Sequence, residues 1–227
     1  MKVYLCGQKY FGMLVLKMIL NAGHNIVGVS APSPESGAVD RLWGEASLKG
    51  IPVMPSGRLN GENLPPGVDL IVAAHSHDFI GRKTRNRSAL GAIGFHPSLL
   101  PLHRGRDAIR WTIKLGEKIS GGTVFWLNDT VDGGPVAAQD WCWVEPGDTA
   151  ESLWREKIQP MGVRLLASAL SDISAGRLVR IPQNHKMATW EPSLNPPPLY
   201  RPDLPQIGSY PSGYTVVMER DLMPIGM

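Results

Sequence analysis

A histidine in a rigid setting is the first residue of this sequence that suggests chemistry. His96 directly follows the apolar residues 92–95 and is followed by Pro97 and Pro101. Proline fixes its own φ angle, so the imidazole should leave the predicted strand with little backbone freedom. A histidine that only fills a core seldom needs such rigid neighbours. Because imidazole gains and loses a proton near neutral pH, we predict that His96 is catalytic.

Carboxylates lie in a polar turn further along the chain, residues 128–134. This turn contains Asp129 and Asp132 together with Asn128 and Thr130. Aspartate is common in turns because its side chain can accept hydrogen bonds from nearby main-chain N–H groups. Taken alone, the aspartates of this turn are therefore explained by hydrogen bonds that close the loop, without a catalytic role.

A histidine-rich segment, residues 75–78, follows the apolar run 69–74, which is typical of a strand buried on both faces. A dinuclear metal hydrolase would place an aspartate two residues beyond the second histidine, whereas Asp78 is adjacent to it, so a metal site is not favoured. The interpretation we favour is a loop that holds a flat polar ring with main-chain groups and the side chains of Phe79 and Ile80.

A positively charged run follows that loop and contains Arg82, Lys83, Arg85 and Arg87. Such a run usually forms a solvated helix face, which is the interpretation we favour. The alternative is a surface that attracts an acidic substrate.

The elements that must position these residues alternate along the chain. Strands are predicted at residues 3–6, 25–30, 51–53, 69–74, 92–95, 122–127 and 135–144, and helices at residues 11–20, 40–49, 82–90, 108–116 and 149–176. This order predicts an α/β fold with a doubly wound, mostly parallel sheet, whose ligands bind beyond the carboxyl ends of the strands. Residues 7–12 lack the spacing of a nucleotide-binding fingerprint.

The length of 227 residues fits one such domain with an appendage. We predict a catalytic domain at residues 1–185 and a Pro-rich C-terminal extension at residues 186–227, because prolines at residues 192–211 oppose helix and central strand.

Composition narrows the class of protein. A hydrophobic share of 43% and a charged share of 19% are those of a globular protein, and a net charge of +3 does not indicate a nucleic-acid-binding surface. No apolar run is long enough to cross a membrane. Cys6 and Cys142 are predicted to be buried thiols in a reducing compartment, so we expect a soluble cytoplasmic protein without a bound metal.

Several motifs together resemble the folate-dependent formyltransferase family. They are His-Pro-Ser-Leu-Leu-Pro at residues 96–101, Arg104-Gly105, Gly-Thr-Val at residues 122–124 and Val-Asp-Gly-Gly-Pro at residues 131–135. The family includes methionyl-tRNA, glycinamide ribonucleotide and sugar N-formyltransferases, and the resemblance covers about residues 1–180. It implies a Rossmann-like formyltransferase fold and 10-formyltetrahydrofolate as the formyl donor.

The resemblance also implies roles for particular residues. His96 and Asp132 match the family's catalytic histidine and aspartate. The folate would contact His77, Asp78, Phe79 and Ile80 after the buried strand, and Asn128, Asp129 and Thr130 in the polar turn. Attack of an amine on a formyl carbon needs a hydrogen-bond donor for the oxyanion and a carrier for the amine proton, which suit an imidazole and a carboxylate.

The sequence departs from the family at two positions. Gly94 occupies the place of the family's asparagine and cannot supply a side-chain amide. Ser98 and His103 are the nearest side chains that could substitute as oxyanion donors. Phe125 follows the Gly-Thr-Val run, where one branch of the family carries a histidine.

We expect the acceptor to be the amine of a small molecule, with an amino-sugar nucleotide as the first choice and a homodimer as a possible assembly. The opening loop lacks the phosphate cradle of the purine-pathway branch, and the residues after 185 are too few and too Pro-rich for the C-terminal barrel of the tRNA enzymes. The alternatives are a folate-binding protein with reduced or lost activity, a formyltetrahydrofolate deformylase and, with less support, methionyl-tRNA formylation or a metal-dependent hydrolase.

Overall fold

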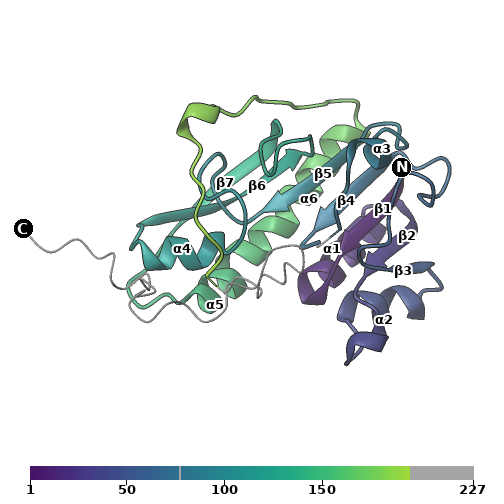
Figure 1. The fold of residues 1–227 in the computed structure, drawn as a ribbon, viewed down its shortest axis with the longest axis horizontal. Coiled ribbons are helices and arrows are strands. Elements are labelled where there is room, and N and C mark those ends of the chain that lie inside the picture. The colour runs from purple at the N-terminus through teal and green to yellow at the C-terminus, as the bar shows by residue number, and fades with distance from the viewer. Residues whose placement is uncertain (77, 195–227) are drawn as a thin grey trace, which may run out of the picture. The chain divides into compact units, whose positions relative to one another are not determined.

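A seven-stranded sheet with the strand order β3-β2-β1-β4-β5-β6-β7 forms the centre of the computed structural model, which describes residues 1–76 and 78–194 (Figure 1). Strands β1 to β5 pair in parallel, and β6 and β7 are antiparallel additions, so the prediction of a doubly wound, mostly parallel sheet is confirmed. The strands are Lys2–Gly7 (β1), Asn25–Ala31 (β2), Val53–Pro55 (β3), Leu70–Ala74 (β4), Ala92–His96 (β5), Ile119–Trp126 (β6) and Val136–Trp143 (β7).

Helices connect and flank these strands. They are α1 (Lys9–Asn21), α2 (Arg41–Leu48), α3 (Arg82–Arg85), α4 (Ala108–Lys114), α5 (Ala150–Ser152) and α6 (Gln159–Ser174), with a π-helical turn η2 (Leu153–Ile158) between α5 and α6 and short 3₁₀ turns η1 (Pro34–Ser36) and η3 (His185–Met187). The long helix predicted at residues 149–176 is therefore present as three consecutive segments. It begins with a capping box between Thr149 and Ser152.

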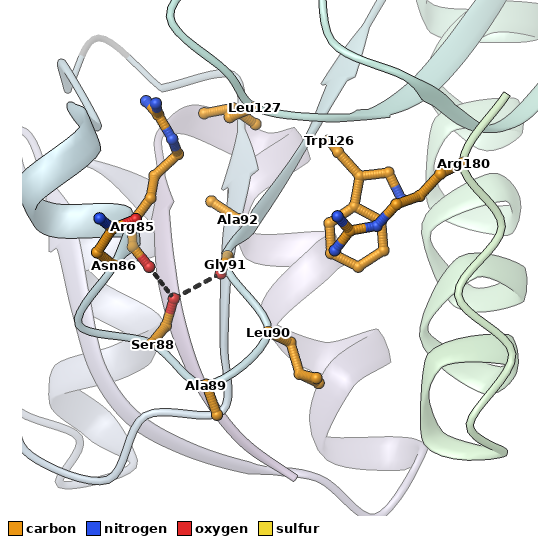
Figure 2. Close-up of a pocket in the computed structure, with 10 residues that line it drawn as sticks. All are labelled: Arg85, Asn86, Ser88, Ala89, Leu90, Gly91, Ala92, Trp126, Leu127 and Arg180. Atoms are coloured by element: carbon orange, nitrogen blue, oxygen red, sulfur yellow. Dashed lines mark hydrogen bonds between the residues drawn. The ribbon is translucent and has the colours of Figure 1, made fainter. Parts of the chain in front are cut away.

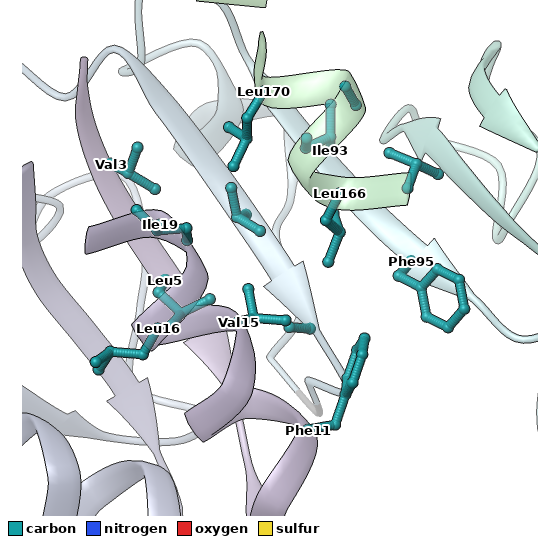
Figure 3. Close-up of a cluster of buried hydrophobic side chains, with 14 of the residues drawn as sticks. Val3, Leu5, Phe11, Val15, Leu16, Ile19, Ile93, Phe95, Leu166 and Leu170 are labelled. Carbon is teal, nitrogen blue, oxygen red and sulfur yellow. The ribbon is translucent and has the colours of Figure 1, made fainter. Parts of the chain in front are cut away.

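The main hydrophobic core lies between one face of the sheet and helices α1, α2 and α6. Apolar side chains recur at helical spacing along α1, and they pack against alternate residues of β1, β4 and β5 (Figure 3). Phe11, for example, packs against Phe95 with a ring-centroid distance of 5.3 Å. This core holds β5 rigidly, and β5 carries His96 at its last position.

The opposite face of the sheet is covered mainly by loops. A smaller apolar cluster there contains Tyr4, Cys6, Ile71 and Ala92 from the strands, covered by loop residues such as Ile80. Gly94 belongs to this face, because a Cβ atom at residue 94 would lie 3.6 Å from Ala73 Cβ. Loops thus lie over the face of the sheet to which Gly94 belongs.

The predicted helix 82–90 is wrong in its length. Helix α3 ends at Arg85, and the Ser88 hydroxyl then lies 2.8 Å from the carbonyl oxygens of both Arg85 and Gly91. A serine that bonds to nearby carbonyls competes with a continuing helix, so the chain turns into β5 instead.

The burial of the two cysteines corrects one further prediction. Cys6 is buried as predicted, whereas Cys142 lies on the edge strand β7 and is only partly buried.

The segment after α6 returns across the domain. Ile181 forms an isolated antiparallel bridge with Val136, and residues 183–194 then continue past the loop that follows His96. The boundary predicted at residue 185 stays a prediction, and residues 195–227 of the Pro-rich extension lie outside the described residues. No helix among the described residues is long and apolar enough to cross a membrane.

Candidate active site

His96 and Asp132 lie next to each other, although they are far apart in the sequence. The distance from His96 Nδ1 to Asp132 Oδ2 is 3.6 Å, and the His96 side chain is almost completely buried. This distance exceeds a normal hydrogen bond, so each group keeps the capacity to bind a third group, such as an amine or a formyl oxygen. The predicted pair therefore shares one site.

The main chain fixes the orientation of the His96 ring. Nε2 lies 2.7 Å from the carbonyl oxygen of His103. A carbonyl oxygen can only accept, so Nε2 must carry a proton. In the neutral ring Nδ1 is then an unprotonated nitrogen that faces Asp132, and a second proton on Nδ1 would be attracted by the carboxylate.

The main chain also fixes Asp132. Its φ angle of 48° lies in the left-handed region, which aspartate tolerates better than most residues, and its Oδ2 accepts a hydrogen bond of 2.7 Å from the main-chain N–H of Gly105. Among the described residues, Oδ1 of Asp132 has no hydrogen-bond partner, so one oxygen is held and the other is available.

Gly94 is bordered by apolar side chains. A Cβ atom at residue 94 would lie 3.0 Å from Leu127 Cδ1 and 3.5 Å from the Phe125 ring. The departures from the family at residues 94 and 125 are therefore neighbours in space, and apolar groups occupy the volume beside residue 94.

Neither substitute donor predicted from the sequence is available. The Ser98 hydroxyl donates its proton to the carbonyl oxygen of Leu102 at 2.6 Å. The His103 ring has Nε2 3.0 Å from Glu117 and Nδ1 3.0 Å from Glu191, the latter as an ion-pair contact outside hydrogen-bond geometry. Both predictions are wrong because these side chains are already used within the fold.

The residues predicted to contact folate after β4 differ in their exposure. Phe79 is 87% exposed, while Ile80 is buried in the apolar cluster below it. Asp78 turns inward and accepts hydrogen bonds from the Ser30 hydroxyl at 2.7 Å and from the main-chain N–H of Gly57. Asp78 therefore serves the fold with its carboxylate, and His77 lies outside the described residues.

Ion pairs join the polar turn to the charged run. Asp129 pairs with Arg82 and, at 2.6 Å, with Arg85. Hydrogen bonds from Arg82 and then Arg85 hold the pKa of Asp129 below its usual value. Arg82 and Arg85 are thus neither solely a solvated helix face nor free to bind an acidic ligand. Asn128 Oδ1 accepts from the main-chain N–H of Thr130 at 2.9 Å, which shapes the same turn.

A cavity of about 550 Å³ lies elsewhere, at the amino end of β5 (Figure 2). Its lining includes Ser88, Ala92, Trp126 and Arg180, with Arg180 stacked on the Trp126 ring at 4.2 Å. His96 is at the opposite end of the same strand. His96 and Asp132 do not line this cavity, so we place the candidate site at these two residues and not at the cavity.

The histidine-rich segment considered for a metal site includes His77, which lies outside the described residues. Among the described residues no group of three or more His, Cys, Asp or Glu side chains is arranged to hold a metal ion.

Comparison with known proteins identifies a family for the part of the chain that contains His96 and Asp132. Residues 59–170, which include β4, β5 and β6, match the family model of the formyl transferase domain. A methionyl-tRNA formyltransferase from Kosmotoga olearia is 30% identical over 207 residues, covering 86% of this chain and 66% of that protein. The chain belongs to the formyl transferase family.

Other relatives of this formyl transferase chain are much longer. The mitochondrial 10-formyltetrahydrofolate dehydrogenase of Mus musculus is 36% identical over 201 residues, but the chain spans only 22% of its length and 84% of its own. Among solved structures, an N-formyltransferase from Helicobacter canadensis in complex with folinic acid and dTDP-3-aminofucose has a TM-score of 0.70 at 17% identity, over 84% of this chain and 70% of that one. At this identity the likeness shows the fold alone.

Sequence reasoning missed the groups that hold the pair. The His103 carbonyl, the Gly105 N–H and the Gln183 side chain all contact His96 or the Asp132 turn. Main-chain groups leave no trace in residue type. Gln183 is 51 residues from Asp132 in the sequence, so no local spacing indicates their contact.

Proposed function

We propose that this chain transfers the formyl group of 10-formyltetrahydrofolate to the amine of a small molecule, with His96 and Asp132 as the catalytic pair. The observation that carries the proposal is the 3.6 Å approach of His96 Nδ1 to Asp132 Oδ2 in a chain of the formyl transferase family. The proposal would fail if the side chains of His96 and Asp132 pointed into separate cavities.

The proposed chemistry follows from the hydrogen-bonding positions that the described residues leave unused, Nδ1 of His96 and Oδ1 of Asp132. When an amine attacks the formyl carbon, the formyl oxygen gains negative charge and the nitrogen must lose a proton. A proton on His96 Nδ1 would stabilise the oxyanion. Oδ1 of Asp132 would accept the amine proton and pass it to N10 of the folate, so that the C–N10 bond breaks and tetrahydrofolate leaves. Because Nε2 is bonded to the His103 carbonyl, the ring can exchange protons through Nδ1 without losing its orientation.

The residues around the pair fit a reduced folate in part. The exposed Phe79 ring offers a flat apolar surface, and Ile80 beneath it is held in the apolar cluster. Main-chain groups of residues 128–130 would bind polar edges of the ring system. We assign Asp129 to holding this turn through its arginine partners, and the folate would bind to the turn that results.

For the acceptor we propose an amino-sugar nucleotide. Support comes from the lack of a phosphate cradle at residues 7–12 and from the fold shared with an N-formyltransferase crystallised with dTDP-3-aminofucose. We propose that the protein acts in the cytoplasm, where reduced folates are used.

The experiment is a screen of amino-sugar nucleotides and other amines with 10-formyltetrahydrofolate, in which tetrahydrofolate and formate are both measured. Tetrahydrofolate with formylated amine supports transfer, and tetrahydrofolate with formate in the absence of amine indicates a deformylase instead. Binding of 10-formyltetrahydrofolate without any turnover would identify a folate-binding protein, and absence of binding would overturn all of these functions.

A further inference from the structure

A buried polar contact joins the C-terminal segment to the turn that carries Asp132. The side-chain Nε2 of Gln183 donates to the carbonyl oxygens of Asp132 at 2.8 Å and of Gly134 at 2.7 Å. Its Oε1 accepts from Arg104 Nη2 at 2.6 Å. One amide thus ties together the Asp132 turn and the loop that follows His96. We propose that Gln183 is a positioning residue that sets the Asp132 carboxylate against His96.

The loop beyond Arg104 carries the group that holds the carboxylate itself. Gly105, the next residue, donates its main-chain N–H to Asp132 Oδ2 at 2.7 Å. Gln183 therefore fixes the Asp132 turn from both sides, directly through two carbonyl oxygens and indirectly through Arg104 and Gly105. A shift of Gln183 would move both the carboxylate and its donor.

The same segment also anchors the residue that orients His96. Thr189 Oγ1 accepts from the main-chain N–H of His103 at 2.8 Å, and the His103 carbonyl accepts from His96 Nε2. Both members of the catalytic pair are thus connected to residues 183–189 by buried or partly buried hydrogen bonds.

Packing alone does not explain this arrangement. Arg104 is 3% exposed. Among the described residues, its Nε has no hydrogen-bond partner and no carboxylate pairs with its guanidinium group. Its Nη2 contacts are the neutral groups Gln183 Oε1 and His185 Nδ1. A buried cation without a carboxylate partner costs stability, and an apolar pair would fill this space at a lower cost. We infer that the contact of Gln183 with Arg104 serves to position Asp132, since displacing a catalytic group by about 1 Å can lower the rate roughly 100-fold.

The inference rests on the proposed function for its kinetic part, so the test has a second measurement that needs no turnover. Gln183→Leu removes all three hydrogen bonds. Gln183→Glu keeps an acceptor for Arg104, and adds a charge partner for it, but removes both donations to the Asp132 turn. Ile19→Val, a buried change in α1 on the far face of the sheet, serves as a matched control that lowers stability only.

We expect kcat, normalised to the folded fraction, to fall about 10- to 100-fold in Gln183→Leu and Gln183→Glu with KM for 10-formyltetrahydrofolate changed less than threefold, and to stay unchanged in Ile19→Val. A purely structural role predicts instead that Gln183→Glu, which supplies Arg104 with a charge, retains kcat. Normal kcat per folded molecule in both Gln183 variants would overturn the proposal.

The second measurement is the ¹H–¹⁵N spectrum of the His96 ring, assigned by its loss in His96→Gln. Asp132→Asn should shift these ring resonances, Gln183→Leu should shift them in the same direction, and the double variant should show no further change. Unchanged resonances in Gln183→Leu would refute positioning even if no acceptor is ever found. Shifted resonances in a protein that lacks turnover would leave positioning intact and reject only the proposed function.

Discussion

The proposed catalytic pair, His96 and Asp132, and the predicted folate-binding segments differ in how the fold holds them. His96 is buried and bonded to the main chain, and the carboxylate of Asp132 is bonded to a main-chain N–H. Phe79 is almost fully exposed, and Asp129 is held by side-chain ion pairs with the exposed Arg82 and the largely buried Arg85. Proton transfer needs fixed geometry, whereas a ring that stacks on a surface needs room, so the two parts should respond to mutation very differently.

The largest effect is expected at the pair itself. His96→Ala and Asp132→Ala should each lower formyl transfer by about 10² to 10⁴-fold, because each removes a group needed for proton movement. Both variants should retain the wild-type circular dichroism spectrum. His24→Ala, at a partly exposed histidine near the N-terminus, is the matched control and should keep full activity. Wild-type rates in the His96 and Asp132 variants would remove these residues from the mechanism.

Gly94 offers a gain-of-function test of the same pair. Gly94→Ala and Gly94→Asn both bring a Cβ within 3.0 Å of the flexible end of Leu127, so both should lose stability by about 1 kcal/mol. Only asparagine adds an amide donor, and a single oxyanion donor is worth about 10² to 10³ in rate in a well-studied hydrolase. We expect Gly94→Asn to exceed Gly94→Ala in kcat by at least about tenfold, and equal rates would show that another donor already serves the oxyanion.

Asp78 shows how far the sequence predicts the folate-binding segment that follows β4. The buried strand before them was predicted correctly, because a continuous apolar run indicates burial on both faces. The direction of the Asp78 side chain could not be predicted from the sequence, because its partners Ser30 and Gly57 are 48 and 21 residues away in the chain. The pairing of His96 with Asp132 was predicted only through resemblance of separate motifs, and the main-chain groups that orient the pair had no sequence signal at all.

Substitution of Asp78 should therefore change stability more than binding. Asp78→Ala leaves the Ser30 hydroxyl and the Gly57 N–H without their acceptor, so we expect the free energy of unfolding to fall by about 2 kcal/mol. Asp78→Asn keeps one acceptor and should lose less. Denaturant unfolding measures the difference, and a tenfold loss of folate affinity in a fully stable Asp78→Ala protein would instead place the carboxylate in the binding site.

The smallest effect is expected at Asp129. Asp129→Asn weakens the pairing with Arg82 and Arg85, which should loosen the turn and raise KM for 10-formyltetrahydrofolate about threefold, with less difference at high salt because the pair is exposed. Asp172→Asn, which breaks an exposed pair with Arg177, is the control and should leave KM unchanged.

The pH dependence of stability gives a second test of the role of Asp129. The pKa of Asp129 is lowered in the folded protein by its arginine partners, so its contribution to stability is fully present above the unfolded value of about 4. That contribution is lost as the pH falls through the folded pKa. Thermal unfolding measured between about pH 2.5 and pH 5 should thus show a slightly weaker acid dependence in Asp129→Asn than in wild type. A change confined to neutral pH would contradict this assignment, because Asp129 stays ionised there, and would transfer the effect to another group in the turn.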